Sequence, residues 1–213
     1  MGLDLILDGD VLAPRSETEL LGRTALSILS KADEPSPLVI DMCCGSGNLA
    51  CALATALPKA RVLAADLTDG AVRTARLNVE RLGLRDRVTV RQGDLFSALE
   101  GDEASGRAML VVCNPPYIST GKLAGESAHL LEAEPREAFD GGPYGISILQ
   151  RLVREAPAYL APGGHLAFEF GVGQERQAAS LVARAGSFAP LDLINDEQGV
   201  PRVAVVRYHG AKP

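Results

Sequence analysis

The chain of 213 residues is 46% hydrophobic and 23% charged, the balance of a globular protein that buries a sizeable core. Its net charge of −6 disfavours DNA or structured RNA as a partner, because domains that bind a duplex usually carry a basic face. No stretch approaches the roughly 20 apolar residues of a membrane helix, and no basic segment followed by an apolar run opens the chain. We therefore expect neither a membrane span nor a signal peptide.

The first 36 residues predict a small hairpin followed by a helix. Apolar residues flank the turn dipeptide Asp8-Gly9 within residues 3–12, a typical hairpin pattern. Ser16 and Glu19 have the spacing of a capping box, and apolar residues continue at helical spacing to Leu29. We expect residues 1–36 to pack on a catalytic domain formed by residues 37–213.

From residue 38 onward, predicted strands alternate with predicted helices. The strands are expected at 38–42, 61–65, 88–91, 109–113, 166–170, 191–194 and 203–208, and the helices at 48–57, 69–82, 146–160 and 174–185. This alternation predicts an α/β fold with a mostly parallel sheet covered on both faces. The last two strands are joined by a connection too short for a crossover helix, so we expect them to pair antiparallel. Residues 118–144 show no clean period, and so long a connection is usually functional.

The four cysteines predict reduced thiols and no metal site. Cys43, Cys44, Cys51 and Cys113 form no C-x-x-C pair, and no histidine lies near them in the sequence. Reduced, packed thiols are typical of a cytoplasmic protein.

Glycines and acidic residues follow the first three predicted strands, where an open parallel sheet binds ligands. Gly45 and Gly47 allow a tight turn before a helix. Asp66 ends the second strand, where it can accept hydrogen bonds from ribose hydroxyls, and Asp94 follows the third, where it can accept one from an exocyclic amine. Carboxylates repel phosphate, so the pattern favours a nucleoside with a free ribose diol and a cationic sulfonium. A dinucleotide site and a plain tight turn are the alternatives, although the G-x-G-x-x-G spacing and a P-loop lysine are absent. The expected cofactor-binding residues are Asp41, Cys43, Cys44, Gly45, Ser46, Gly47, Asp66, Leu67, Asp94, Leu95 and Asn114.

The motif Asn114-Pro115-Pro116-Tyr117 follows the fourth predicted strand. Its two prolines have a fixed φ and no N–H, so the loop is stiff and its carbonyls are free. The Asn114 amide oxygen and the Pro115 carbonyl can each accept a hydrogen bond from one planar NH2, which holds its nitrogen for an in-line methyl transfer. Tyr117 can stack on the acceptor and favour developing positive charge. A proline-rich turn without chemistry is the alternative. We expect Asn114, Pro115 and Tyr117 to be catalytic and Pro116 and Tyr117 to bind the substrate.

Nearly end to end, the sequence resembles the HemK/PrmC protein-glutamine methyltransferases. The similar segments are 14–19 (Pro-Arg-Ser-Glu-Thr-Glu), 41–47, 114–117, Glu134-Pro135 with Asp140-Gly141-Gly142, Pro162-Gly163-Gly164 with Glu169, and 196–205. The resemblance implies a seven-stranded class I methyltransferase fold, S-adenosylmethionine as cofactor, and transfer to a glutamine side-chain amide. In that family the acceptor glutamine lies in the Gly-Gly-Gln loop of peptide-chain release factors. The resemblance also places Arg15 and Glu17 beside the substrate pocket.

The sequence departs from this family at three places, which keeps other acceptors open. Family members usually begin with a helical docking domain, whereas this chain starts at the predicted hairpin. Cys43 and Cys44 stand where Gly and a hydroxyl residue are usual, and Ser16 stands where Pro is usual, so we expect a reshaped methionine pocket. The alternatives are a methyltransferase for a small amide or amine, an adenine-N6 methyltransferase disfavoured by the acidic charge, and a cofactor-binding partner module without activity.

Overall fold

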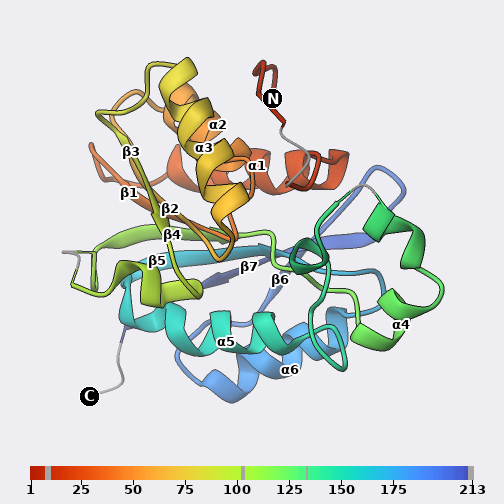
Figure 1. Ribbon diagram of the computed structural model, residues 1–213. Coiled ribbons are helices and arrows are strands. Elements are labelled where there is room, and N and C mark those ends of the chain that lie inside the picture. The colour runs from red at the N-terminus through yellow and green to blue at the C-terminus, as the bar shows by residue number, and fades with distance from the viewer. Residues whose placement is uncertain (8–10, 102–103, 133, 211–213) are drawn as a thin grey trace.

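A computed structural model of the chain describes residues 1–7, 11–101, 104–132 and 134–210. Its centre is one seven-stranded sheet between two helical layers (Figure 1). The strands are β1 (Leu38–Met42), β2 (Arg61–Asp66), β3 (Val88–Gln92), β4 (Ala108–Cys113), β5 (Leu160–Glu169), β6 (Asp192–Asn195) and β7 (Pro201–Arg207). The helices are α1 (Ser16–Leu29), α2 (Asn48–Ala56), α3 (Asp69–Arg81), α4 (Thr120–Ala124), α5 (Ser147–Glu155) and α6 (Glu175–Ala185).

The strand order is β3-β2-β1-β4-β5-β7-β6. Strands β1 to β5 are parallel to one another, whereas β7 pairs antiparallel with both β5 and β6. This arrangement is that of a class I methyltransferase, and it confirms the predicted mostly parallel sheet with an antiparallel terminal hairpin. The chain builds outward from β1 to β3 and then returns to place β4 on the other side of β1. Ligands bind in such sheets outside the carboxyl ends of the two strands at this reversal.

Two apolar cores hold the layers to the sheet. One face packs on α1, α2 and α3, with Leu21, Leu53 and Val72 in its core. The other packs on α5 and α6, with Leu152 and Phe168 in its core. The strands between them carry apolar side chains toward both faces, as buried parallel strands do. A side chain of this size contributes roughly 1.5–3 kcal/mol when it is fully buried, so the sheet is a rigid base for the loops at its edge.

Two helix boundaries differ from their prediction. The capping box is wrong: Arg15 is the N-cap of α1 without a side-chain cap, Ser16 bonds to Glu17, and Glu19 pairs with the amino terminus. The helix predicted at 146–160 ends earlier, because α5 stops at Glu155 and continues only as a 3-10 turn, η4 (Ala156–Ala158). Pro162-Gly163-Gly164, expected to stop that helix, lies inside β5, where the register with β4 shifts.

The predicted amino-terminal hairpin is wrong, because the described residues on either side of its turn do not form strands. Residues 1–7 and 11–15 contain no strand, and Asp8-Gly9 lies outside the described residues. The backbone of Ile6 pairs instead with one buried side chain of α3. Asn78 Oδ1 accepts from the Ile6 N–H at 2.7 Å, and Asn78 Nδ2 donates to the carbonyls of Ile6 at 3.0 Å and Ser46 at 2.9 Å.

The connection 118–144 has structure of its own. It holds α4 and two 3-10 turns, η2 (Ala128–Glu132) and η3 (Arg136–Ala138), and Ile118 forms an isolated parallel bridge with Asp140. The connection therefore folds back beside the end of β4. Among the described residues, no helix has the length and apolar character to cross a bilayer.

Candidate active site

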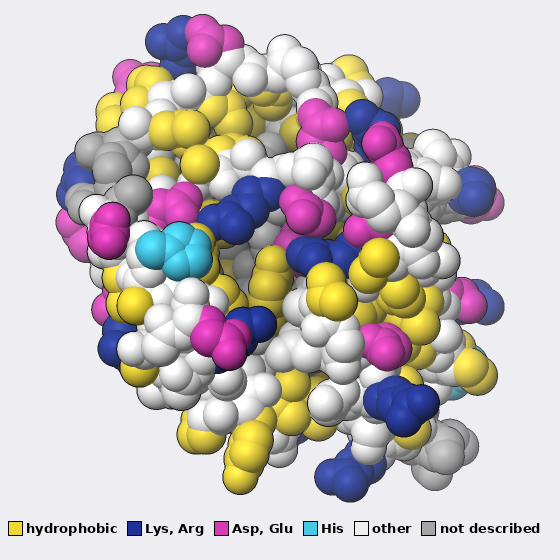
Figure 2. Space-filling model, turned by 90° about the vertical axis from the view of Figure 1, so that its right-hand side faces the viewer, with side chains coloured by type: hydrophobic (Ala, Val, Ile, Leu, Met, Phe, Trp, Pro, Cys, Tyr) yellow, Lys and Arg dark blue, Asp and Glu magenta, His cyan; other side chains and the backbone are white. Residues whose placement is uncertain are grey.

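A cavity of about 500 Å³ lies at the carboxyl ends of the parallel strands, within the range of small-molecule sites. It is lined by the turn after β1, the ends of β2 and β3, the loop after β4, residues of 11–18, and residues of 120–148. Figure 2 shows this end of the molecule, hollowed near its centre, with basic and acidic side chains intermixed around the hollow. At the switch point of the sheet, the ends of β1 and β4 therefore share a cavity.

The turn after β1 forms one wall of the cavity. Cys43, Cys44, Gly45 and Ser46 line it, and two backbone bonds tie the turn to the end of β2. The Cys44 N–H donates to the Ala65 carbonyl at 3.0 Å, and the Gly45 N–H donates to Asp66 Oδ2 at 2.9 Å. The Oγ of Ser46 is buried without a hydrogen-bond partner among the described residues.

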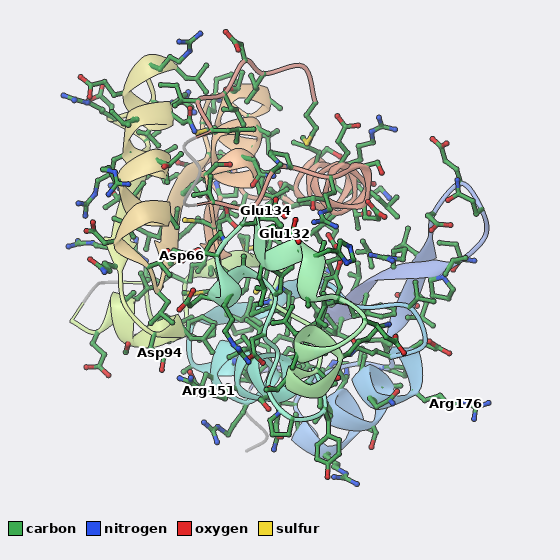
Figure 3. The ribbon with its side chains drawn as sticks, turned by 45° about the vertical axis from the view of Figure 1, so that its right-hand side comes forward. Asp66, Asp94, Glu132, Glu134, Arg151 and Arg176 are labelled. Atoms are coloured by element: carbon green, nitrogen blue, oxygen red, sulfur yellow. The ribbon has the colours of Figure 1, made fainter. Side chains whose placement is uncertain are left out.

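Three aspartates lie around this wall in different environments. Asp41 is fully buried, its Oδ2 accepts from the Ala50 N–H at 2.9 Å, and burial raises its pKa to about 8. Asp66 lines the cavity, and burial raises its pKa against the lowering effect of backbone bonds from Gly45 and Thr68. Asp94 also lines the cavity, but both of its oxygens accept from Arg151 of α5, at 2.8 and 2.9 Å (Figure 3).

Two residues of the cavity wall have strained backbones. Among the described non-glycine residues, Cys43 at φ +55° and Leu95 at φ +50° are the two in the left-handed region, and both line the cavity. Such a conformation costs about 1–3 kcal/mol and is concentrated at functional sites. Cys43 therefore adopts the conformation of the glycine usual at its position and adds a thiol to the wall.

The loop after β4 forms the opposite wall through Asn114 and Pro116. The Asn114 side chain is held by α1, because its Nδ2 donates to Thr18 Oγ1 at 3.0 Å. Thr18 in turn donates to Glu169 Oε2 at the end of β5, at 3.1 Å. An amide whose nitrogen is occupied in this way presents its oxygen on the other side.

Glu169 also holds the last residue of the motif. Tyr117 donates its hydroxyl to Glu169 Oε1 at 3.1 Å, and Arg202 Nη2 of β7 lies 3.3 Å from the Tyr117 hydroxyl and 3.5 Å from Glu169 Oε1. The Arg202 guanidinium also lies 5.9 Å from the Tyr117 ring centroid. Burial, with the Glu169 charge as a second cause, raises the pKa of Tyr117 to about 12. The tyrosine is therefore a neutral hydrogen-bond donor at physiological pH.

Glycines of the connection 118–144 and of its continuation brace the acceptor loop from outside. A Cβ added at Gly141 would lie 2.7 Å from the Pro116 carbonyl oxygen, and one at Gly145, whose φ is +71°, would lie 2.4 Å from that of Tyr117. Gln174 completes the brace, because its Nε2 donates to the carbonyls of Tyr117 at 2.9 Å and Gly145 at 3.2 Å. The Asp-Gly-Gly signature thus packs against the backbone of Asn-Pro-Pro-Tyr.

A segment from the amino-terminal part forms the remaining wall. Val11, Leu12 and Pro14 line the cavity, as do residues of 135–140 across from them. Glu134 joins the two sides: its Oε1 accepts from the Ala13 N–H at 2.8 Å, and its Oε2 pairs with Arg15 at 3.2 Å. Residues 11–15 therefore lie across the acceptor side of the cavity.

The structure separates the predicted site residues into two groups. The residues that line the cavity are Cys43, Cys44, Gly45, Ser46, Asp66, Leu67, Asp94, Leu95, Asn114 and Pro116. Those that do not line it are Asp41, Gly47, Pro115, Tyr117, Arg15 and Glu17. Gly47, at φ +75°, instead packs against Ala75 of α3. Arg15 is turned toward Glu134 and Phe139, and Glu17 toward Ser16.

Sequence reasoning missed Thr18, Glu169 and Arg202 as parts of the site. Thr18 carries a signal, since it shares the buried face of α1 with Leu21, Ala25 and Leu29, where a hydroxyl needs a partner. Glu169 also carries one, as an acidic residue that ends an apolar strand. Arg202 carries none that a local pattern reveals, because only the pairing of β5 with β7 brings it to the loop.

The chemistry of the cavity is that of two walls with different donors and acceptors. The first wall offers carboxylates and backbone groups to a cationic nucleoside. The second offers the Asn114 amide oxygen to an N–H donor. Since both walls face one space, the arrangement can bring an electrophile and a nitrogen together.

Comparisons with known proteins agree with this arrangement. The family model described as "Methyltransferase small domain" matches residues 21–143. A release factor glutamine methyltransferase of Geobacter sulfurreducens is 40% identical over 202 residues, which cover 95% of this chain and 67% of that protein. A ribosomal protein uL3 glutamine methyltransferase of Bradyrhizobium diazoefficiens is 40% identical over 183 residues, 82% of this chain and 55% of that protein.

Among solved structures, a protein-(glutamine-N5) methyltransferase, release factor-specific, from Alicyclobacillus acidocaldarius has a TM-score of 0.56 and 25% identity. The match covers 97% of this chain and 99% of that one. The similarity therefore extends over both walls of the cavity.

Proposed function

We propose that this chain, which belongs to the family of release factor glutamine methyltransferases, methylates the side-chain amide nitrogen of a glutamine in a protein. The observation that carries the proposal is the shared cavity, with Asp66 on one wall and Asn114 on the other. These walls follow β1, β2 and β4, which are neighbours in the sheet. Two groups bound in one shared cavity can meet for an in-line transfer.

The first wall fits S-adenosylmethionine, which supplies a methyl group on a cationic sulfonium. The cavity volume of about 500 Å³ is adequate. Asp66 offers its carboxylate to the ribose hydroxyls, and Asp94 lies where the adenine amine is expected. Ser46 lines the same cavity. A carboxylate-rich wall stabilises the positive charge of a sulfonium and repels a phosphate.

The second wall holds the acceptor. Asn114 Oδ1, which lies on the cavity wall, accepts a hydrogen bond from the glutamine NH2, which orients the nitrogen and stabilises positive charge that develops on it during transfer. In the transfer the N–CH3 bond would form as the S–CH3 bond of the sulfonium breaks and leaves a neutral thioether, and one amide proton would pass to solvent. Tyr117 anchors the loop through Glu169. No described side chain has to act as a strong base, because positioning supplies most of the rate enhancement.

Two proteins are candidates to carry the glutamine that is methylated. Relatives with 40% identity are named for a release factor and for ribosomal protein uL3, and the resemblance in the signature segments favours the release factor. Both substrates belong to the translation machinery of the cytoplasm. The four free cysteines of this chain agree with a reducing compartment.

The test is to incubate the protein with methyl-labelled cofactor and purified release factor, uL3, or a metabolite extract. A matched release factor with Gly-Gly-Asn in place of Gly-Gly-Gln controls for labelling elsewhere. Label in the release factor that is absent from the control supports the proposal. Label in uL3 also supports it and identifies uL3 as the protein that carries the glutamine. Label confined to small molecules overturns it in favour of a small-amide methyltransferase.

A further inference from the structure

We propose that Thr18 and Glu169 are positioning residues that fix the orientation of the Asn114 side-chain amide, so that Oδ1 rather than Nδ2 meets the acceptor nitrogen. The proposal rests on the proposed function, because it names the acceptor as an NH2 group. A side-chain amide can rotate by half a turn with little change in shape, and the reversed Asn114 would present hydrogens to hydrogens. The motif therefore needs something outside itself to select one orientation.

The single proton of the Thr18 hydroxyl makes this selection. Thr18 Oγ1 lies 3.1 Å from Glu169 Oε2 and 3.0 Å from Asn114 Nδ2. An ionised carboxylate has no proton to give, so the hydroxyl donates to Glu169. It can then only accept from Asn114, which requires the Nδ2 side of the amide. The direction of both hydrogen bonds therefore follows from the negative charge of the Glu169 carboxylate.

Burial raises the pKa of Glu169, but its hydrogen-bond and ion-pair partners favour its charged form. Its side chain is 1% exposed, and it accepts from Thr18 on one oxygen and from Tyr117 on the other. Arg202, which is 9% exposed, lies 3.5 Å away and forms a buried ion pair with it. Both hydroxyl protons and the guanidinium therefore point to one carboxylate. Glu169, at the end of β5, thus anchors Tyr117 directly and anchors Asn114 through Thr18.

Protonation of Glu169 would reverse the direction of the two hydrogen bonds that link it through Thr18 to Asn114. A neutral carboxyl can donate to Thr18 Oγ1, which frees the Thr18 proton to bind Asn114 Oδ1 and turns Nδ2 toward the acceptor. Burial raises the pKa of Glu169, while Tyr117, Arg202 and Thr18 lower it and the charge of Glu17 on α1 raises it. The active orientation is therefore present above this pKa, and it is lost as the pH falls through it.

Thr18→Val tests the relay, because valine keeps the shape and removes the hydroxyl. We expect kcat/KM for the protein acceptor to fall about tenfold to a hundredfold, the effect of one buried hydrogen bond, with the cofactor Kd unchanged by calorimetry. Thr18→Ser restores the hydroxyl and should recover most of this loss. Thr24→Val is the matched control, since the Thr24 hydroxyl of the same helix bonds only to the Leu20 carbonyl. Loss of transfer in both Thr18 variants, or in neither, overturns the proposal.

The pH profile separates positioning from packing. The ratio of the Thr18→Ser rate to the Thr18→Val rate should decline toward one as the pH falls, because protonated Glu169 no longer orients the amide. Glu169→Gln, which can donate to Thr18, should lose about a hundredfold in kcat/KM at every pH. A rate ratio that does not change with pH overturns the role of the charge.

A spectroscopic measurement does not depend on the substrate. The Asn114 side-chain NH2 signals, assigned by their loss in Asn114→Ala, should shift in Thr18→Val and return in Thr18→Ser. Unchanged NH2 signals in Thr18→Val overturn the inference even if the wild-type enzyme methylates glutamine. If the wild-type enzyme labels only small molecules but the signals behave as expected, the proposed function fails and the relay remains.

Discussion

The two walls of the cavity are built in different ways. The cofactor wall comes from short runs of sequence, in which consecutive residues of the turn after β1 and single acids after β2 and β3 reach the cavity. The acceptor wall depends on side chains that are far apart in sequence, as in the relay from Thr18 to Asn114 and Glu169. Substitutions far from the cofactor wall should therefore leave it intact. The acceptor wall should instead be disrupted by substitutions on any of three elements, α1, the loop after β4, and β5.

The largest effect that tests this difference is expected from Asn114→Ala. The variant should lose transfer by about a hundredfold to a thousandfold, the cost of removing one preorganised transition-state contact. Cofactor affinity measured by calorimetry should stay within about twofold, because the cofactor wall is built from other strands. Full activity would remove Asn114 from the mechanism, and loss of cofactor binding would show that the walls are not independent.

The converse change is Asp66→Ala. We expect cofactor Kd to rise about tenfold to a hundredfold, because hydrogen bonds to a charged group are removed and the Gly45 N–H loses its acceptor. Asp69→Ala is the matched control, since Asp69 lies on α3 with 81% of its side chain exposed. Equal affinities of the two variants in calorimetry would contradict the ribose assignment.

A smaller effect is expected at the brace behind the acceptor loop. Gly145→Ala brings a Cβ within 2.4 Å of the Tyr117 carbonyl oxygen, whereas Gly173→Ala, at a similar φ of +82°, meets nothing within 4 Å. Both variants carry left-handed strain, so their difference reports the contact alone. Transfer rates should be about tenfold lower for Gly145→Ala than for Gly173→Ala. Cofactor affinities that also differed would link the brace to the other wall.

The smallest effect concerns Asp41 behind the cofactor wall. Burial raises its pKa from 3.8 to about 8, so between these values the folded protein keeps a proton that the unfolded chain has lost. Its contribution therefore lowers the free energy of unfolding as the pH rises. Asp41→Asn has no such proton, and its relative stability should increase by roughly 1–2 kcal/mol between pH 5 and pH 6. Urea midpoints of the ligand-free proteins measure this, with Asp69→Asn as the exposed control. A pH-independent difference would mean that Asp41 is ionised when buried.

The sequence predicts the sheet and the cofactor wall because both depend on short-range patterns. Apolar runs alternate with helical periods, and Asp66 and Asp94 follow strands that a reader can find without the fold. The acceptor loop is also visible, since Asn114 to Tyr117 are contiguous. The carboxylate that anchors this loop is not, because the link from Glu169 to Tyr117 spans 52 residues.

The wrong predictions have a similar cause. The capping box failed because Glu19 found a partner in the amino terminus rather than in its own helix. Arg15 and Glu17, which the resemblance places beside the pocket, do not line the cavity, and Thr18 is the buried residue of this turn; their part in substrate binding stays a prediction. The hairpin signal at residues 3–7 failed because Ile6 found its hydrogen-bond partner on α3. For the capping box and the hairpin, a tertiary contact replaced the local one.

The contact between Ile6 and Asn78 has a consequence for what cofactor binding does to the amino-terminal segment. Asn78 satisfies both backbone groups of Ile6 as a neighbouring strand would, and its second amide hydrogen reaches the Ser46 carbonyl in the cofactor turn. One buried side chain therefore couples the order of the amino-terminal segment to that of the turn. Ligand binding that steadies Ser46 should slow hydrogen exchange at the Ile6 amide, making a residue outside the cavity a reporter of cofactor occupancy.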